Sequence, residues 1–152
     1  MIRKRRIYLD YAAATPVDKR VVRAMRPYDT ACFANPSAIH KEGVAARRAV
    51  ETARTTIARL LNVRSEEIIF TSGGTEADNL ALFGVVKKAR QKGIETPHIV
   101  TTNIEHPAVL EACRQLEQWG IKVTYVPVEV GGVVDPKKVA AALRPETVTS
   151  RS

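Results

Sequence analysis

The sequence predicts an α/β fold in which helices flank a mostly parallel sheet. From residue 66 onward, short apolar runs alternate with helical stretches, and Gly or Pro marks each change. The resulting order is β-α-β-α-β-α, which is typical of parallel strands joined by crossover helices. At 152 residues, with 45% hydrophobic and 26% charged side chains, the chain has enough apolar material for one domain core.

The N-terminal part of the chain is expected to be mostly helical. A first helix spans roughly residues 18–28, and Pro27 limits it because proline lacks the amide donor that a further turn requires. Asn35-Pro36-Ser37 predicts a turn before a longer second helix. Apolar side chains on that helix keep a spacing of three and four residues, so they form one stripe that packs on another element; they are Val50, Ala53, Ile57, Leu60 and Leu61.

The rest of the chain alternates strands and helices. The expected elements are a buried strand 67–71, a turn 72–74, a helix from Thr75 to about Lys92, a strand 98–102, a helix from Pro107 to Gly120, a strand 121–126, a Gly131-Gly132 turn and a helix after Asp135. Gly93 closes the first of these helices. Pro107 and Pro136 suit the first positions of the other two, where a missing N–H costs nothing.

The net charge of +8 comes from 24 basic and 16 acidic residues, and four of the basic residues form the run 3–6. Such a run is most often a solvated tail. No groove-reading helix, RNA-binding aromatic pair or zinc finger accompanies it, so nucleic-acid binding is only the lesser alternative. Cys32 and Cys113 form no C-x-x-C pair, and no run reaches the roughly 18 apolar residues of a membrane helix, which favours a soluble protein of the reducing cytoplasm.

The segment 71–78, Thr-Ser-Gly-Gly-Thr-Glu-Ala-Asp, joins a predicted strand to a predicted helix. The first turn of a helix has unpaired N–H groups and a positive dipole end, and glycine lets an anion approach the backbone. Gly74 and Thr75 are therefore candidate phosphate ligands. The alternative is a plain connection in which Thr75 caps the helix and Asp78 completes a capping box.

A second candidate group follows the next predicted strand at 103–107. Parallel strands open their carboxyl ends on one edge of the sheet, where ligands bind, so this turn and the turn at 72–74 are expected to share that edge. Pro107 places His106 near a helix N-cap, and an imidazole there can stack on a flat ring or transfer a proton. An exposed loop histidine is the alternative for His106.

Four further residues carry weaker signals. His98 opens a strand and is predicted to be an exposed edge residue, whereas His40 could face either a site or solvent. Cys113 lies in an amphipathic helix and is expected to be a small buried hydrophobe. Cys32 has no base or cation nearby in the sequence, so it is not predicted to be a nucleophile.

Taken together, four motifs resemble the N-terminal part of a cysteine desulfurase, from the iron–sulfur cluster assembly and nitrogen fixation branch of the class V aminotransferase-like enzymes. The likeness runs from about residue 7 to residue 148 in order and spacing. The motifs are Tyr8-Leu9-Asp10-Tyr11-Ala12-Ala13-Ala14-Thr15-Pro16, Asn35-Pro36-Ser37 with His40, Ile69-Phe70-Thr71-Ser72-Gly73-Gly74-Thr75-Glu76-Ala77-Asp78-Asn79, and Glu105-His106-Pro107-Ala108-Val109-Leu110.

The resemblance implies a pyridoxal phosphate (PLP) enzyme of fold type I, a homodimer whose large domain has a mostly parallel sheet. Residues 1–15 would be an N-terminal segment joining the small domain, and residues 16–152 an incomplete large PLP-binding domain. Gly74 and Thr75 match the positions that hold the phosphate of PLP, and His106 matches the histidine that stacks on its ring and assists proton transfers. Ala13, Asn35 and His40 match a region bordering the active-site entrance, without an assigned role.

The reaction implied by the resemblance removes sulfur from L-cysteine, giving L-alanine and an enzyme persulfide for a sulfur-acceptor or iron–sulfur scaffold protein. Where relatives continue with an apolar strand, this chain reads Thr149-Ser150-Arg151-Ser152 and ends. The PLP-binding Lys and the persulfide-forming Cys of the family pattern are therefore not matched, and neither cysteine replaces the latter. The expectation is a truncated, frameshifted or split-gene product, inactive alone; the alternative is a non-catalytic piece that associates with a complementary chain.

Overall fold

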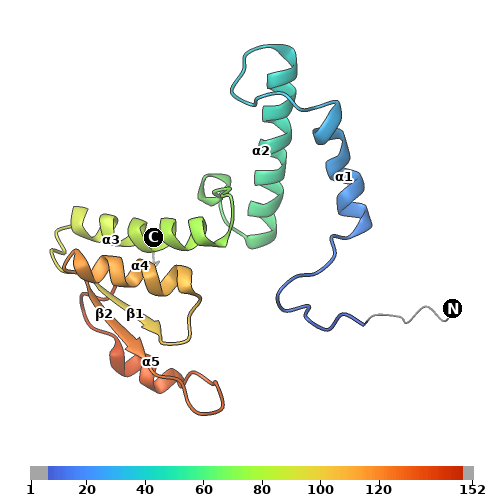
Figure 1. The fold of residues 1–152 in the computed structure, drawn as a ribbon. Helices are drawn as coiled ribbons and strands as arrows, with labels where there is room; N and C mark the ends of the chain where they lie inside the picture. Colours follow the sequence, from blue (N-terminus) through green and yellow to red (C-terminus); the bar gives the residue numbers. More distant parts are fainter. Residues whose placement is uncertain (1–6, 149–152) are drawn as a thin grey trace. The chain divides into compact units, whose positions relative to one another are not determined.

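The computed structural model describes residues 7–148, which divide into two compact units between Ile69 and Phe70. Figure 1 shows the helices and strands of both units along the chain. The basic run at 3–6 and the segment 149–152, about which the sequence makes predictions, lie outside the described residues. None of the helices within 7–148 is long and apolar enough to cross a membrane.

The first unit begins with helix α1 (Lys19–Thr30), capped by Asp18, whose carboxylate accepts a hydrogen bond from the Arg20 N–H at 2.7 Å. The prediction that Pro27 limits this helix is wrong, because α1 runs on to Thr30. A proline removes only one bond of the helical ladder. The Pro27 carbonyl still accepts a hydrogen bond from the Ala31 N–H at 2.9 Å, so the helical bonding continues beyond the proline.

The predicted turn at residues 35–37 is confirmed. The Asn35 side-chain oxygen accepts from the Ser37 N–H at 2.9 Å, and the Asn35 carbonyl accepts from the Ala38 N–H at 3.0 Å. Helix α2 (Lys41–Leu61) follows with His40 as its N-cap. A Cβ on Gly43 would lie 2.6 Å from the Ala38 carbonyl oxygen, so the close packing of turn and helix requires glycine.

The predicted strand 67–71 is not formed. A short 3-10 helix, η1 (Ser65–Glu67), takes up its first residue, and no strand follows before α3. Ile69 and Phe70 are 64% and 47% exposed instead of buried. A strand needs a hydrogen-bonded neighbour, and the sheet within residues 7–148 contains only β1 and β2, which pair with each other.

The second unit holds the predicted α/β alternation. Its elements are α3 (Gly74–Gln91), β1 (His98–Thr102), α4 (Pro107–Gln118), β2 (Lys122–Val126) and α5 (Pro136–Ala142). The two strands pair in parallel, in register from His98 opposite Lys122 to Thr102 opposite Val126. Gly93 and Gly120 follow the ends of α3 and α4 with φ of 88° and 80°, as expected for helix-terminating glycines.

Helices cover both faces of this two-stranded sheet (Figure 1). Successive side chains of a strand point to opposite faces. Ile99 packs in one buried cluster with residues of α3 and α4, and α5 contacts β2. The buried cluster between the sheet and helices α3 and α4 consists of Val86, Ile99, Cys113, Leu116 and Ile121.

The segment around Thr147 pairs with β1 through an isolated parallel bridge. The His98 N–H donates to the Glu146 carbonyl at 3.0 Å, and the Val148 N–H donates to the His98 carbonyl at 2.8 Å. Thr147 thereby forms a parallel bridge with His98 on the edge of β1 that faces away from β2. This arrangement extends the parallel sheet predicted from the sequence.

The prediction that His98 is an exposed edge residue is wrong, because its side chain is fully buried. Its Nδ1 lies 2.7 Å from the Thr147 hydroxyl and its Nε2 lies 2.8 Å from the Thr124 hydroxyl. Burial, assisted by the positive charge of Arg144, lowers the pKa of the His98 imidazole. The neutral ring joins β1, β2 and the incoming segment 144–148, which explains how a polar side chain is tolerated there.

Candidate functional site

The loop before α3 is held by Glu76 rather than by Thr75. Gly73 is the N-cap of α3 and has no side chain to offer. The Glu76 carboxylate reaches back to the Ser72 N–H at 2.7 Å and the Ser72 hydroxyl at 2.6 Å, and these donors, the hydroxyl first, lower the pKa of Glu76. The predicted capping box of Thr75 and Asp78 is therefore wrong, because the helix begins one residue earlier than Thr75.

The start of α3 can bind an anion. The N–H groups of Gly74 and Thr75, in its first turn, donate to no acceptor within residues 7–148. A Cβ built on Gly73 or Gly74 would meet nothing within 4 Å, so the space before these amides is open. Unpaired amides and the positive end of the helix dipole suit a phosphate there.

His106 occupies the predicted position at the start of α4. It is the N-cap residue, and its Nδ1 accepts a hydrogen bond from the Ala108 N–H at 3.1 Å. Pro107 takes the first helical position, as predicted. The side chain is exposed, and its Nε2 makes no hydrogen bond to any residue that the structure describes.

Thr75 and His106 line the same pocket, which has a volume of about 500 Å³. The pocket lies between α3 and α4, which pack against each other. Its lining residues are Thr75, Asn79 and Phe83 from α3, with His106 and Pro107, Ala108, Glu111, Ala112 and Gln115 from α4. The predicted common edge of two strand ends depended on the unformed strand 67–71; helix packing instead brings the two residues together.

Three polar residues of the pocket were not identified from the sequence: Asn79, Glu111 and Gln115. Asn79 follows Thr75 by one helical turn, and its side-chain N–H donates to the Thr75 carbonyl at 2.8 Å. Glu111 pairs with Arg114. The spacing of four residues from the predicted site residue Thr75 was the signal that could have found Asn79.

The remaining candidates lie elsewhere. Ala13, Asn35 and His40 belong to the first unit, so their predicted place near an active-site entrance stays a prediction. Cys113 is fully buried as expected, and burial, followed by the Glu117 carboxylate, raises the pKa of its thiol. Cys32 is exposed, and both cysteines are free thiols.

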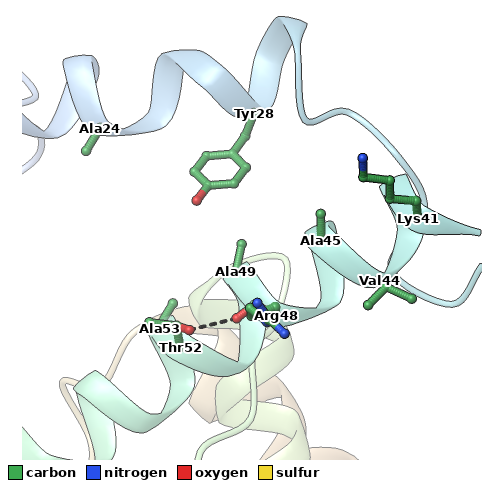
Figure 2. A pocket seen from close by; sticks show the side chains of 9 residues that line it. All are labelled: Ala24, Tyr28, Lys41, Val44, Ala45, Arg48, Ala49, Thr52 and Ala53. Atoms are coloured by element: carbon green, nitrogen blue, oxygen red, sulfur yellow. Dashed lines mark hydrogen bonds between the residues drawn. The ribbon is translucent and has the colours of Figure 1, made fainter.

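A larger pocket of about 710 Å³ lies within the first unit, between α1 and α2. Figure 2 shows Tyr28 of α1 directed toward α2, which presents small side chains such as Ala45 and Ala49. Its rim carries Lys41 and Arg48. The lining residues include no histidine, cysteine or carboxylate, and the titratable side chains among them are Tyr28, Lys41 and Arg48.

Comparison with known proteins identifies the family. The sequence model described as Aminotransferase class-V matches residues 7–149. The chain belongs to this family. It is 49% identical over 145 residues to cysteine desulfurase IscS of Dictyoglomus turgidum, covering 95% of this chain and 36% of that protein. It is 48% identical over 143 residues to putative cysteine desulfurase IscS 1 of Bacillus subtilis, covering 94% and 37%.

Solved structures agree with the fold. A NifS-like protein superposes with a TM-score of 0.83 at 37% identity, covering 94% of this chain and 38% of that one. The structure titled SspA in complex with cysteine gives a TM-score of 0.80 at 42% identity, covering 92% and 40%. The resemblance to the N-terminal part of a cysteine desulfurase and the predicted partial α/β fold are both confirmed. The chain spans little more than a third of its relatives, which are PLP-dependent enzymes.

Proposed function

We propose that this chain forms the part of a PLP-dependent cysteine desulfurase that holds the cofactor's phosphate and faces its ring. The observation that carries the proposal is the pocket shared by Thr75 and His106. It combines an anion-binding helix start with an imidazole, and these can contact the phosphate and the ring of a phosphorylated aromatic cofactor respectively. The relatives that cover the chain, named cysteine desulfurases, support the assignment.

Gly74 and Thr75 would hold the phosphate. Their amides are unpaired within the described chain, and the Thr75 hydroxyl can add a further donor. Glu76 is already bound to Ser72, so its carboxylate fixes the loop instead of competing for those amides. Asn79 supports the same turn through its bond to the Thr75 carbonyl.

His106 would face the ring and hold a proton close to it. When bound, PLP supplies an electron sink for the breaking of bonds at the substrate's α-carbon. Pro107 and the hydrogen bond from the Ala108 N–H fix the direction of the imidazole, so little conformational entropy is lost in orienting it during the reaction. A histidine ring can donate or accept a proton, so His106 could take part in proton transfer at this position.

The complete protein would act on L-cysteine, release L-alanine and pass a persulfide sulfur to an acceptor or iron–sulfur scaffold protein. One matched structure is titled as a complex with cysteine, which supports this substrate. We propose a homodimer in the cytoplasm, with residues 1–15 joining a small domain and residues 16–152 belonging to the large one. The two free thiols agree with a reducing compartment.

A second candidate function is association with a complementary polypeptide without catalysis. Ile69 is 64% exposed, and β1 has an edge on which only the segment ending at Val148 has begun to pair. Exposed apolar side chains and open strand edges favour binding of another chain. Association and catalysis are compatible, since a desulfurase would require the remaining two thirds of the family's sequence.

The test combines the chain with the complementary C-terminal part of the Dictyoglomus relative and measures PLP retention. Thr75→Ala should weaken retention by about 1–2 kcal/mol, the value of a charge-assisted hydrogen bond. Thr56→Ala is the control, because Thr56 is exposed on α2 and its hydroxyl donates only to the Thr52 carbonyl four residues earlier. Equal PLP affinity of the Thr75 variant and the control would contradict the phosphate site. The chain alone should neither attach PLP covalently nor release sulfide.

A further inference from the structure

We infer that His106 meets the ligand of its pocket through Nε2 alone, as a hydrogen-bond donor, because Nδ1 is committed to helix α4. The identity of that ligand rests on the proposed function, whereas the assignment of the two nitrogens does not. The assignment follows from the backbone geometry at the start of α4.

The first step is the cap. The His106 Nδ1 accepts the Ala108 N–H at 3.1 Å, and His106 has the extended backbone of an N-cap residue, with φ of −58° and ψ of 145°. Ala108 is buried, so its amide has little access to water as a replacement partner. A nitrogen that accepts a hydrogen bond carries no hydrogen, so the neutral imidazole must carry its hydrogen on Nε2.

The second step concerns proton uptake. Adding a proton to Nδ1 would turn the acceptor into a donor that opposes the Ala108 N–H, and the cap would be lost. Proton uptake by His106 is thereby coupled to opening of the first turn of α4. The imidazole can stay in place over the pocket only while it is neutral, with the Nε2 hydrogen available.

No charged side chain named here replaces the Ala108 N–H as the partner of the His106 Nδ1. Glu105 accepts from the Thr102 hydroxyl at 2.8 Å, and Glu111 pairs with Arg114. The residues that α3 contributes to the pocket are Thr75, Asn79 and Phe83, none of which is charged. His40 is different, because its Nδ1 caps α2 through the Gly43 N–H and also lies 3.0 Å from the Glu42 carboxylate.

The consequence is a chemical preference in the pocket. A ring that presents Nε2–H binds an acceptor, such as a carboxylate or phenolate oxygen, and does not accept a hydrogen bond from a donor at that atom. In the proposed function, His106 would therefore bind anionic oxygen atoms of cofactor or substrate. A proton can leave Nε2 only if Nδ1 takes one up, which would break the bond from the Ala108 N–H, so proton transfer through His106 is coupled to opening of the helix cap.

The test is nitrogen NMR of the full chain labelled with 15N-histidine, without PLP. Solid-state spectra report the tautomer whether the chain is monomeric or assembled. His106→Asn identifies the His106 signals by their loss, and asparagine keeps an N-cap acceptor, so α4 should remain intact. We expect the Nε2–H tautomer near neutral pH, and faster hydrogen exchange of the Ala108 amide as the ring is protonated. An Nδ1–H tautomer, or an Ala108 amide indifferent to that protonation, would overturn the inference.

A second measurement separates this inference from the proposed function. In the complemented protein, His106→Asn should leave thermal stability measured without PLP unchanged while losing the contribution of His106 to PLP retention; His106→Ala should lose both. If His106 has the inferred tautomer but His106→Asn retains PLP like the unaltered protein, the proposed role of His106 in holding PLP is contradicted and the N-cap hydrogen bond of Nδ1 is supported. Loss of stability in His106→Asn equal to that in His106→Ala would contradict the cap itself.

Discussion

Replacing Thr147 by valine should destabilise the chain more than replacing Thr124 by valine, although both remove one hydroxyl beside the same imidazole. Each substitution preserves side-chain shape and leaves one nitrogen of the buried His98 ring without its partner. The Thr147 hydroxyl, in addition, accepts the Arg144 N–H at 2.7 Å. Thr147 therefore also holds the segment 144–148, which bridges to β1, whereas the Thr124 hydroxyl contacts only the imidazole ring.

The magnitudes follow from these partners. An unsatisfied buried polar group costs about 1–3 kcal/mol, and this is the expected loss for Thr124→Val. Thr147→Val should lose about 0.5–1.5 kcal/mol more, the net value of one ordinary hydrogen bond, because the Arg144 amide is exposed and regains water.

Urea unfolding of the full chain, followed by circular dichroism, measures both differences. Thr96→Val is the matched control, because Thr96 is exposed, lies in the same unit and makes no side-chain hydrogen bond to a residue of the described part. It should stay within about 0.5 kcal/mol of the unaltered chain. If Thr147→Val and Thr124→Val are equally stable, or if both match the control, the buried network around His98 is not as described.

Three further predictions concern the site and its surroundings. His106→Ala in the complemented protein should slow turnover by about 10²–10⁴-fold, as loss of an acid–base group does; an unimpaired rate would contradict its role. Because the pKa of buried His98 lies below its ordinary value of 6.5, stability should be full above that value and fall as pH decreases below it, while His98→Gln should flatten this dependence in urea titrations. Cys32 should react with a thiol reagent in the folded chain and Cys113 only after unfolding, since Cys113 is buried; equal rates would show that α4 does not cover it.

The elements that depend on local signals could be predicted from the sequence. Asp135 caps α5 and Pro107 begins α4 because cap and N1 preferences act within one turn of helix. Strands β1 and β2 formed where predicted, since each is an apolar run between turns and the other lies beside it. His106 could be placed at its N-cap for the same local reason.

What failed depends on contacts distant in sequence. The run at 67–71 has the composition of a strand, yet no described strand lies beside it, so it forms no part of a sheet within residues 7–148. His98 was misplaced because its partners are 26 and 49 residues away, beyond the reach of periodicity. The cap of α3 was missed because a carboxylate three residues inside the N-cap, Glu76, acts in place of the Thr75 hydroxyl.

The central claim is that Gly74, Thr75 and His106 form one site for PLP. A crystal structure of the chain assembled with the complementary part of a relative, with PLP bound, tests it most directly. The account predicts phosphate oxygens within hydrogen-bonding distance of the Gly74 and Thr75 amides, with the His106 imidazole against the ring. A phosphate held by other residues, or a cofactor ring remote from His106, would contradict it.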